Sequence, residues 1–171
     1  MDDNDSLAQY ADMGLLLKYV GPPVQPAGNL TYIAGGEVDE ASVTLRFFGS
    51  DLDPDDISHR LGCTPTTARR KGEIVRERWI ATTGVWFLRQ PRRPEHLAAQ
   101  IQELFDRLPA GPRVWDHLRR FDGQLFCRLS CRTWNRQLDL PPELSKQLAL
   151  RHLTLTLDMY FEPDEHETSP E

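Results

Sequence analysis

The stretch Ser42-Val-Thr-Leu-Arg-Phe-Phe48, followed by Asp53-Pro-Asp-Asp56, decides the fold class of this chain. Apolar and polar residues alternate through the first segment, which predicts a strand with one buried face. In the second segment, Asp53 suits the cap of a helix, Pro54 suits its first turn, and the acids that follow oppose the helix dipole. Gly62 is suited to end that helix. The folded part therefore begins with a strand and then a helix.

Further strands and helices follow from the patterns downstream. Residues 73–81 and 84–90 are both strand-like, and the Thr-Thr-Gly sequence around their junction predicts a hairpin. Apolar residues at helical spacing predict a helix over residues 94–108, which a proline ends, and a shorter helix over residues 112–121. Residues 124–134 alternate between apolar and polar side chains and are expected to form the next strand.

The resulting order over residues 42–134 is βαββαβ, the ferredoxin-like order of an antiparallel sheet with helices on one face. A last helix, opened by Pro141-Pro142, and a fifth strand are appended to it. In that strand, alternation predicts that the following residues face the core: Leu153, Leu155, Leu157, Met159 and Phe161. The expected fold class is therefore α+β.

Two segments of different character flank the expected α+β domain, which spans residues 42–162. Residues 1–41 contain several glycines and prolines, so we expect a partly irregular arm with at most a short helix near residues 6–19. Residues 163–171 are rich in proline and glutamate, and we expect them to form an acidic, mobile tail.

Charge is distributed unevenly along the chain, although the net charge is only −6. Residues 1–56 sum to −9, residues 57–161 to +8 and residues 162–171 to −5. A basic body between acidic ends can indicate a charged partner, and it can equally serve solubility alone. No basic leader opens the chain, no apolar stretch is long enough to cross a bilayer, and three cysteines suggest a reducing compartment. We therefore expect a cytoplasmic protein without a membrane partner.

Four short motifs stand out in the first half of the expected domain. They are, in chain order, Asp51-Leu-Asp-Pro-Asp-Asp-Ile-Ser58, Leu61-Gly-Cys-Thr-Pro-Thr66, Arg70-Lys-Gly72 and Thr83-Gly-Val-Trp86. Together with the strand, helix and closing strand around them, they resemble a bacterial family of unknown function, DUF4279, over about residues 42–162. The resemblance implies a small α+β bacterial protein without established catalytic residues. Such orphan domains often resemble partner-binding or toxin-immunity proteins, which is an argument from context rather than from a site.

Motifs that carry chemistry are missing from the sequence. There is no nucleophile elbow, phosphate-binding loop or zinc-protease motif. The acids from Asp51 to Asp56 imitate the start of a calcium loop, but Asp56 and Gly62 stand where that loop needs glycine and glutamate. Cys127 and Cys131 lie on one face of a strand, and no C-x-x-C pair exists for zinc. We expect no catalytic residue, metal, cofactor or small-molecule substrate.

A basic loop is the first candidate binding surface. Arg69, Arg70 and Lys71 precede Gly72, which would allow a close backbone approach to an anion. Arginine can bind a phosphate or a carboxylate at two points at once. The alternative is a solvated loop whose charges protect a strand edge from aggregation.

The sheet face opposite the helices is the second candidate surface. Cations and aromatic rings are expected to share it: Arg46, Phe48, Phe126, Arg128, Arg132, Trp134 and Tyr160. Trp86 of the last quoted motif is a further candidate binding residue. Cations between aromatic rings are typical of single-stranded nucleic acid binding, and equally of protein interfaces. A third reading is simple coverage by the arm of residues 1–41.

These observations lead to one main hypothesis and one alternative. The main hypothesis is a non-enzymatic, cytoplasmic bacterial protein that binds a macromolecular partner, foremost another protein. Its most specific form is an immunity-type inhibitor that covers the active site of its partner with a rigid charged surface. The alternative is a module that binds single-stranded nucleic acid through the basic and aromatic sheet face. Which of the two candidate surfaces is the working one remains open at this point.

Overall fold

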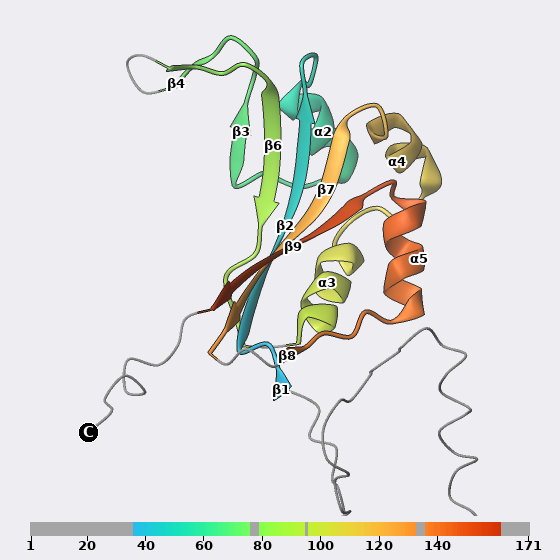
Figure 1. Cartoon of the computed structure of the whole chain (residues 1–171). Coiled ribbons are helices and arrows are strands. Elements are labelled where there is room, and N and C mark those ends of the chain that lie inside the picture. Colours follow the sequence, from blue (N-terminus) through green and yellow to red (C-terminus); the bar gives the residue numbers. More distant parts are fainter. Residues whose placement is uncertain (1–35, 76–78, 95, 133–135, 162–171) are drawn as a thin grey trace, which may run out of the picture. The chain divides into compact units, whose positions relative to one another are not determined.

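The computed structural model describes residues 36–75, 79–94, 96–132 and 136–161. This part of the chain is a mixed α+β structure in which helices lie against one face of a five-stranded sheet (Figure 1), as the patterning predicts. The helices are α2 (Pro54–Leu61), α3 (Leu97–Asp106), α4 (Pro112–Leu118) and α5 (Pro142–Leu150). The sheet strands are β2 (Glu40–Gly49), β3 (Thr67–Arg69), β6 (Gly84–Arg89), β7 (Asp122–Cys131) and β9 (Thr154–Phe161).

The five strands lie in the order β3-β6-β2-β7-β9. β2 occupies the centre and pairs antiparallel with both β6 and β7, and β3 pairs antiparallel with β6. β9 pairs parallel with β7, because α5 carries the chain back along the sheet before β9 begins. The appended strand therefore makes the sheet mixed, and β9 forms one of its two outer edges.

The first helix begins and ends as its sequence predicts. The Asp53 side chain accepts a hydrogen bond of 3.0 Å from the backbone N–H of Asp55, and Pro54 stands in the first turn of α2. Gly62 ends the helix in the left-handed conformation, at φ 66°, where a side chain would be strained. The start of α2 is thereby held in place beside the end of β2.

The core lies between the sheet and the helices. Alternate residues of β2, β6 and β7 are buried against the apolar faces of the helices. The largest side chains with almost no exposure include Phe47, Trp86, Phe105 and Trp115. Cys127 and Cys131 are fully buried in this layer as free thiols, in agreement with their expected position on the inward face.

The predicted hairpin of residues 73–81 with 84–90 is wrong. β6 pairs instead with β3, which lies inside the segment expected to be a basic loop. Residues before β6 form a separate ribbon in which β4 (Ile74–Val75) pairs with β5 (Trp79–Ile80). The ribbon lies beyond the end of the sheet (Figure 1). Strand-like composition was recognised correctly, but composition does not specify which edge a strand meets.

The folded body begins earlier than expected, inside the predicted arm. β1 (Gly36–Glu37) pairs parallel with β8 (Arg136–Gln137), and β2 starts at Glu40. The Asp39 carboxylate holds this corner because it accepts bonds from the Arg132 backbone N–H at 2.8 Å and from the Arg136 guanidinium at 2.7 Å. The predicted helix near residues 6–19, the rest of the arm to residue 35 and the tail lie outside the described residues.

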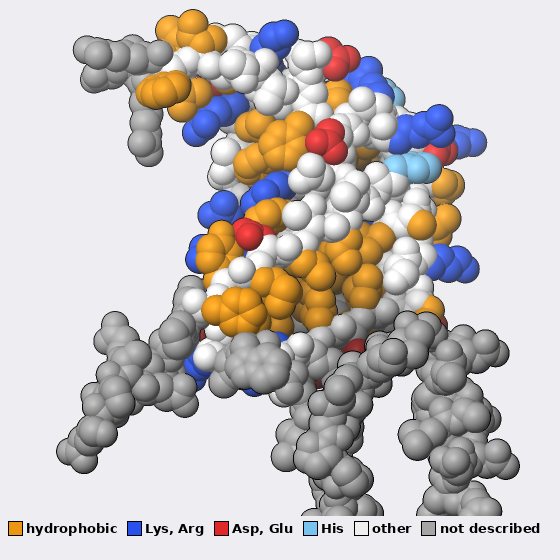
Figure 2. Space-filling view, in the orientation of Figure 1, with side chains coloured by type: hydrophobic (Ala, Val, Ile, Leu, Met, Phe, Trp, Pro, Cys, Tyr) orange, Lys and Arg blue, Asp and Glu red, His pale blue; other side chains and the backbone are white. Residues whose placement is uncertain are grey.

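The expected inward face of β9 is buried only at its beginning. Leu153 is buried and Leu155 is partly buried. Leu157, Met159 and Phe161 were expected to face the core, but they are 40, 48 and 55% exposed. The reason is the position of β9 at the sheet edge, where the strand extends past the helices (Figure 1). Figure 2 shows hydrophobic side chains gathered on the surface along this strand.

Candidate functional site

The sheet face opposite the helices contains a hollow of about 360 Å³. Four of the residues that line it are arginines: Arg46 of β2, Arg89 of β6, Arg128 of β7, and Arg92 of the segment that follows β6. Asp158 and Tyr160 of β9 complete the charged and hydroxyl-bearing part of the lining. We refer to this feature as the arginine hollow. It lies on the face that alternation in the sequence assigns to cations and aromatic rings.

Strand register explains why these side chains meet. Thr44 of β2 stands opposite both Arg89 and Phe126, and Arg128 stands opposite Asp158. Since side chains on neighbouring strands share a face at paired positions, residues far apart in the chain converge here. The guanidinium of Arg46 lies over the Phe126 ring, 3.3 Å from its centroid. Four of the residues predicted for this face are therefore brought together: Arg46, Phe126, Arg128 and Tyr160.

Two of the four cations, Arg46 and Arg89, have no carboxylate within ion-pairing distance among the residues that the structure describes. Burial lowers the pKa of Arg46, the charge of Arg89 lowers it further, and Asp158 acts in the opposite direction. Arg92 differs, because its Nε lies 2.5 Å from the Glu40 carboxylate. Within the described residues, the hollow thus brings together two arginines that no carboxylate pairs.

The wall of the hollow also contains a buried amide, Gln90, whose polar atoms lack hydrogen-bond partners within the described chain. Gln90 is only 4% exposed, and neither Nε2 nor Oε1 has a hydrogen-bond partner within the described chain. Nε of Arg46 is also buried without an acceptor. Buried polar groups left unpaired cost roughly 1–3 kcal/mol each. Bound polar groups from outside would reduce that cost.

The aromatic rings of the hollow are covered by guanidinium groups. Arg128 lies over the Tyr160 ring, 4.0 Å from its centroid, in the same way as Arg46 covers Phe126. The Tyr160 hydroxyl donates a hydrogen bond of 2.8 Å to Asp158. That bond to a carboxylate raises the pKa of Tyr160. Each ring thus has one face against a guanidinium, and this contact helps to hold the arginine in place.

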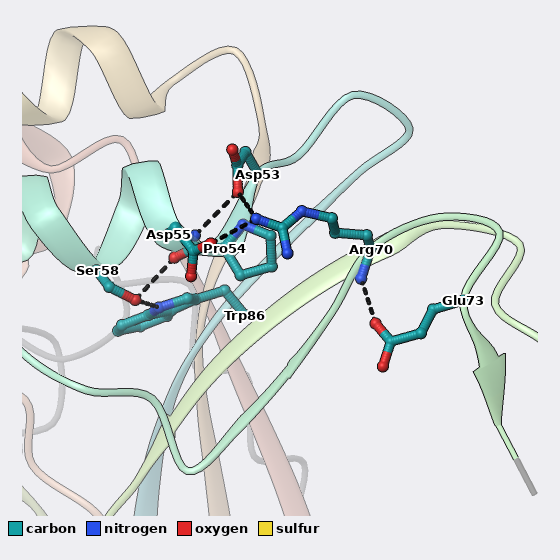
Figure 3. Close-up of polar contacts among 7 residues, drawn as sticks. All are labelled: Asp53, Pro54, Asp55, Ser58, Arg70, Glu73 and Trp86. Carbon is teal, nitrogen blue, oxygen red and sulfur yellow. Dashed lines mark hydrogen bonds and ion pairs between the residues drawn. The ribbon is translucent and has the colours of Figure 1, made fainter.

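The basic loop is partly neutralised by its own neighbours. Arg70 binds Asp53 at 2.7 Å and Asp55 at 2.5 Å, which joins the loop to the beginning of α2 (Figure 3). The hydrogen bond that Arg70 donates to the Asp55 carboxylate is the main reason that the pKa of Arg70 is raised. Arg69 and Lys71 are exposed, and neither lines the arginine hollow. The structure therefore gives Arg70 a structural partner and separates this loop from the hollow.

Trp86 is a correction to the predicted binding residues. Its side chain is fully buried, and its Nε1 donates a hydrogen bond of 3.0 Å to Ser58 Oγ on α2 (Figure 3). Trp86 occupies an inward position of β6, on the same face as Leu88, so it belongs to the core and is closed to a partner. Arg132 is exposed just after β7 and does not line the hollow, and Trp134 lies outside the described residues.

Two residues of the hollow were missed by sequence reasoning. Arg89 alternates with the inward-facing Leu88, so the strand pattern carried a signal for its position. Arg92 lies in an irregular segment between two prolines and has no comparable signal. Its place becomes evident only from its ion pair with Glu40.

The described residues contain neither a metal-binding cluster nor a membrane-spanning helix. No group of three or more His, Cys, Asp or Glu side chains in this part of the chain is arranged to hold a metal ion. Within the same residues, no helix is both long and apolar enough to span a bilayer.

Comparison with known proteins adds a family assignment. No curated protein and no solved structure matches the chain. A family model described as a domain of unknown function, DUF4279, matches residues 39–162. The match begins within one residue of the start of β2 and reaches one residue past the end of β9. It covers well over half of the sequence, and the chain therefore belongs to the DUF4279 family.

Proposed function

We propose that this protein is a non-enzymatic, cytoplasmic bacterial protein that binds another protein through the arginine hollow. The observation that carries the proposal is the pair Arg46 and Arg89, two cations that line one hollow without a carboxylate partner among the described residues. An anionic group of a partner would relieve their mutual repulsion. In the most specific form of the proposal, the protein is an immunity-type inhibitor that covers the active site of its partner.

A side-chain or terminal carboxylate is the anion that this arrangement suits best. Arginine presents its donors in a planar fork that matches a carboxylate, and such charge-assisted bonds are stronger than neutral ones. Arg46 is held over Phe126 and Arg128 over Tyr160, so both guanidinium groups are positioned before a ligand arrives. Binding then costs less side-chain entropy than it would with solvated arginines.

Nucleic acid is the second candidate, favoured by the net charge of +8 over residues 57–161. One feature of the hollow favours protein over nucleic acid. Base stacking needs open ring faces, whereas a guanidinium already lies over one face of Phe126 and of Tyr160. Affinity for an oligothymidylate that falls steeply with salt would instead support nucleic acid.

Capture from lysate of the source cell, with and without nuclease, tests the proposal. The baits are the wild type, the hollow variant Arg46→Glu/Arg89→Glu, and the matched control Arg69→Glu/Lys71→Glu, which changes the same number of charges on the basic loop. We expect one stoichiometric protein that survives nuclease and is lost only with the hollow variant. Circular dichroism and thermal unfolding of each bait check that it is folded. Capture that is lost with the loop variant and kept with the hollow variant contradicts the proposal.

We also propose that the first four sheet strands form a ferredoxin-like unit extended by β9. The support is their order, in which β2 is flanked by β6 and β7 while β3 lies outside β6, together with antiparallel pairing throughout these four. A crystal structure tests this, because a different strand order would contradict it.

A further inference from the structure

The outer edge of β9 is long and unguarded. β9 pairs with β7 on one side and is the last strand of the sheet on the other. Its eight residues extend over roughly 26 Å, and Asp158 is the one charged side chain among them. Proteins usually protect such edges with lysine, proline, bulges or short strands. β9 contains neither lysine nor proline, and within the described residues no other strand pairs with its outer edge.

The two faces of β9 differ in chemistry. Leu157, Met159 and Phe161 form an exposed apolar row on the face opposite to Asp158 and Tyr160. Asp158 and Tyr160 point to the opposite side, where they line the arginine hollow. A strand added here would therefore have one row of side chains against apolar neighbours and the other beside arginines.

Arg128 is placed to reach such an added strand. It belongs to β7, one strand in from the edge, yet its guanidinium lies over the Tyr160 ring of β9. Arg128 and Tyr160 thus bring a cation and an aromatic ring of the edge strand together on the hollow side of the sheet. A glutamate on the next strand, beside Tyr160, would have its carboxylate within reach of this guanidinium.

We propose that β9 binds an extended segment of a protein partner as a sixth strand, and that this segment alternates acidic with apolar residues. The acids lie on the side of the hollow and the apolar side chains pack on Leu157, Met159 and Phe161. This inference rests on the proposed function, because it specifies how the protein partner binds. Main-chain hydrogen bonds supply affinity and the alternating side chains supply specificity.

Charge complementarity favours this occupant over a second copy of β9 and over the C-terminal tail. A second copy of β9 would bring only Asp158 to the hollow side, next to Thr154, Thr156 and Tyr160. Residues 162–171 supply acids, but they contain no aliphatic or aromatic residue for the apolar row. A segment that alternates acidic and apolar residues would place its acids on the side of the arginine hollow and its apolar side chains on the apolar row.

Binding of synthetic peptides to the full chain tests the inference by fluorescence anisotropy. The probe is a fluorescein-labelled peptide of alternating glutamate and valine, and the controls are a block peptide of the same composition and a peptide with lysine in place of glutamate. We expect the alternating acidic peptide to bind at least about tenfold tighter than either control. It should also slow amide exchange in residues 154–161. Equal binding of the block peptide, or protection confined to other strands, overturns the inference.

Variants separate this inference from the proposed function. Met159→Lys places a charge in the apolar row, and Ile74→Lys is the matched control because Ile74 is 72% exposed on the β4–β5 ribbon. We expect Met159→Lys alone to weaken peptide binding and partner capture. If capture depends on Arg46 and Arg89 but not on Met159, the inference fails and the proposed function stands. If capture depends on none of them, both fail. A dimer that Met159→Lys dissociates would assign the edge to a second copy and overturn the inference.

Discussion

At Trp86 a single polar atom links the sheet to the first helix. The indole Nε1 donates to Ser58 Oγ at 3.0 Å, and the same hydroxyl donates to the Pro54 carbonyl at 2.7 Å (Figure 3). The ring is fully buried and lies 6.0 Å from the Phe47 ring between centroids. Because the indole is buried away from water, the Ser58 hydroxyl is its hydrogen-bond acceptor and so lowers the free-energy cost of burying this tryptophan.

We expect Ser58→Ala to lower the free energy of unfolding by about 1–2 kcal/mol, because the buried indole N–H loses its acceptor. Alanine also favours the helix by roughly 0.5 kcal/mol, which offsets part of the loss. Ser145→Ala is the matched control, since Ser145 is an exposed serine inside α5 and reports the helix preference alone. Urea unfolding measures both. Equal stability of the two variants would contradict the role assigned to Ser58.

Single residues also show what sequence could say about the site. Alternation assigned Arg46, Arg128 and Tyr160 to one face, and the structure places all three in the arginine hollow. Trp86 was assigned from a motif without regard to strand phase, and it points into the core. Arg92 follows the end of its strand, where no periodicity applies. Periodicity thus predicts which face a residue shares, but only within a strand.

At the scale of elements, α2 and the strand before it were predicted because their signals are local. Asp53, Pro54 and Gly62 act within a few residues of where they stand. The pairing of β6 with β3 rather than with residues 73–81 depends on which edge is free once β2 is in place. The exposure of Leu157 and Met159 likewise depends on where the helices end. Strand pairing and the exposure of edge residues depend on the assembled sheet, so the local sequence pattern does not predict them.

The corner where β1, β2 and β8 meet should be sensitive to acid. The backbone hydrogen bond from Arg132, with the Arg136 charge, lowers the pKa of Asp39, although partial burial opposes this. A lowered folded-state pKa adds stability above the unfolded value near 3.8, and this stability is lost as pH falls through the folded value. We expect Asp39→Asn to destabilise the protein near neutral pH, with a difference from wild type that narrows below about pH 4.

Urea unfolding at several pH values measures that difference. Asp51→Asn is the control, because Asp51 is exposed in the turn after β2, at the opposite end of that strand from the corner. A gap between Asp39→Asn and wild type that stays constant down to about pH 3 would show that the Asp39 charge does not hold the corner.

At the scale of the whole molecule, one core joins the central strands to the helices α2, α3, α4 and α5 of the described part of the chain. Cys127 lies in its middle, and burial raises the pKa of this thiol to about 12. The folded state therefore holds the thiol proton more tightly than the unfolded chain does. Stability from this group is complete below the unfolded pKa near 9 and declines as pH rises toward 12. Near pH 8 the folded thiol is unreactive, because only the thiolate attacks.

We expect a disulfide reagent at about pH 8 to label Cys63 first, because that thiol is partly exposed, and Cys127 and Cys131 only on global unfolding. The rate of the slow phase should then rise with urea in proportion to the unfolded fraction. Cys63→Ser is the control, and it should remove the fast phase alone. Labelling of all three thiols in a single phase at low urea would contradict a core that opens as one unit.

The unguarded edge of β9 also bears on how much of this protein a cell can keep in solution. Eight strand residues with one charge and an exposed apolar row form the kind of segment from which edge-to-edge aggregation begins. A bound partner strand would remove that hazard by occupying the edge. The abundance of the soluble protein would then follow the abundance of its partner, so that an excess made without it would be lost to aggregates or proteases.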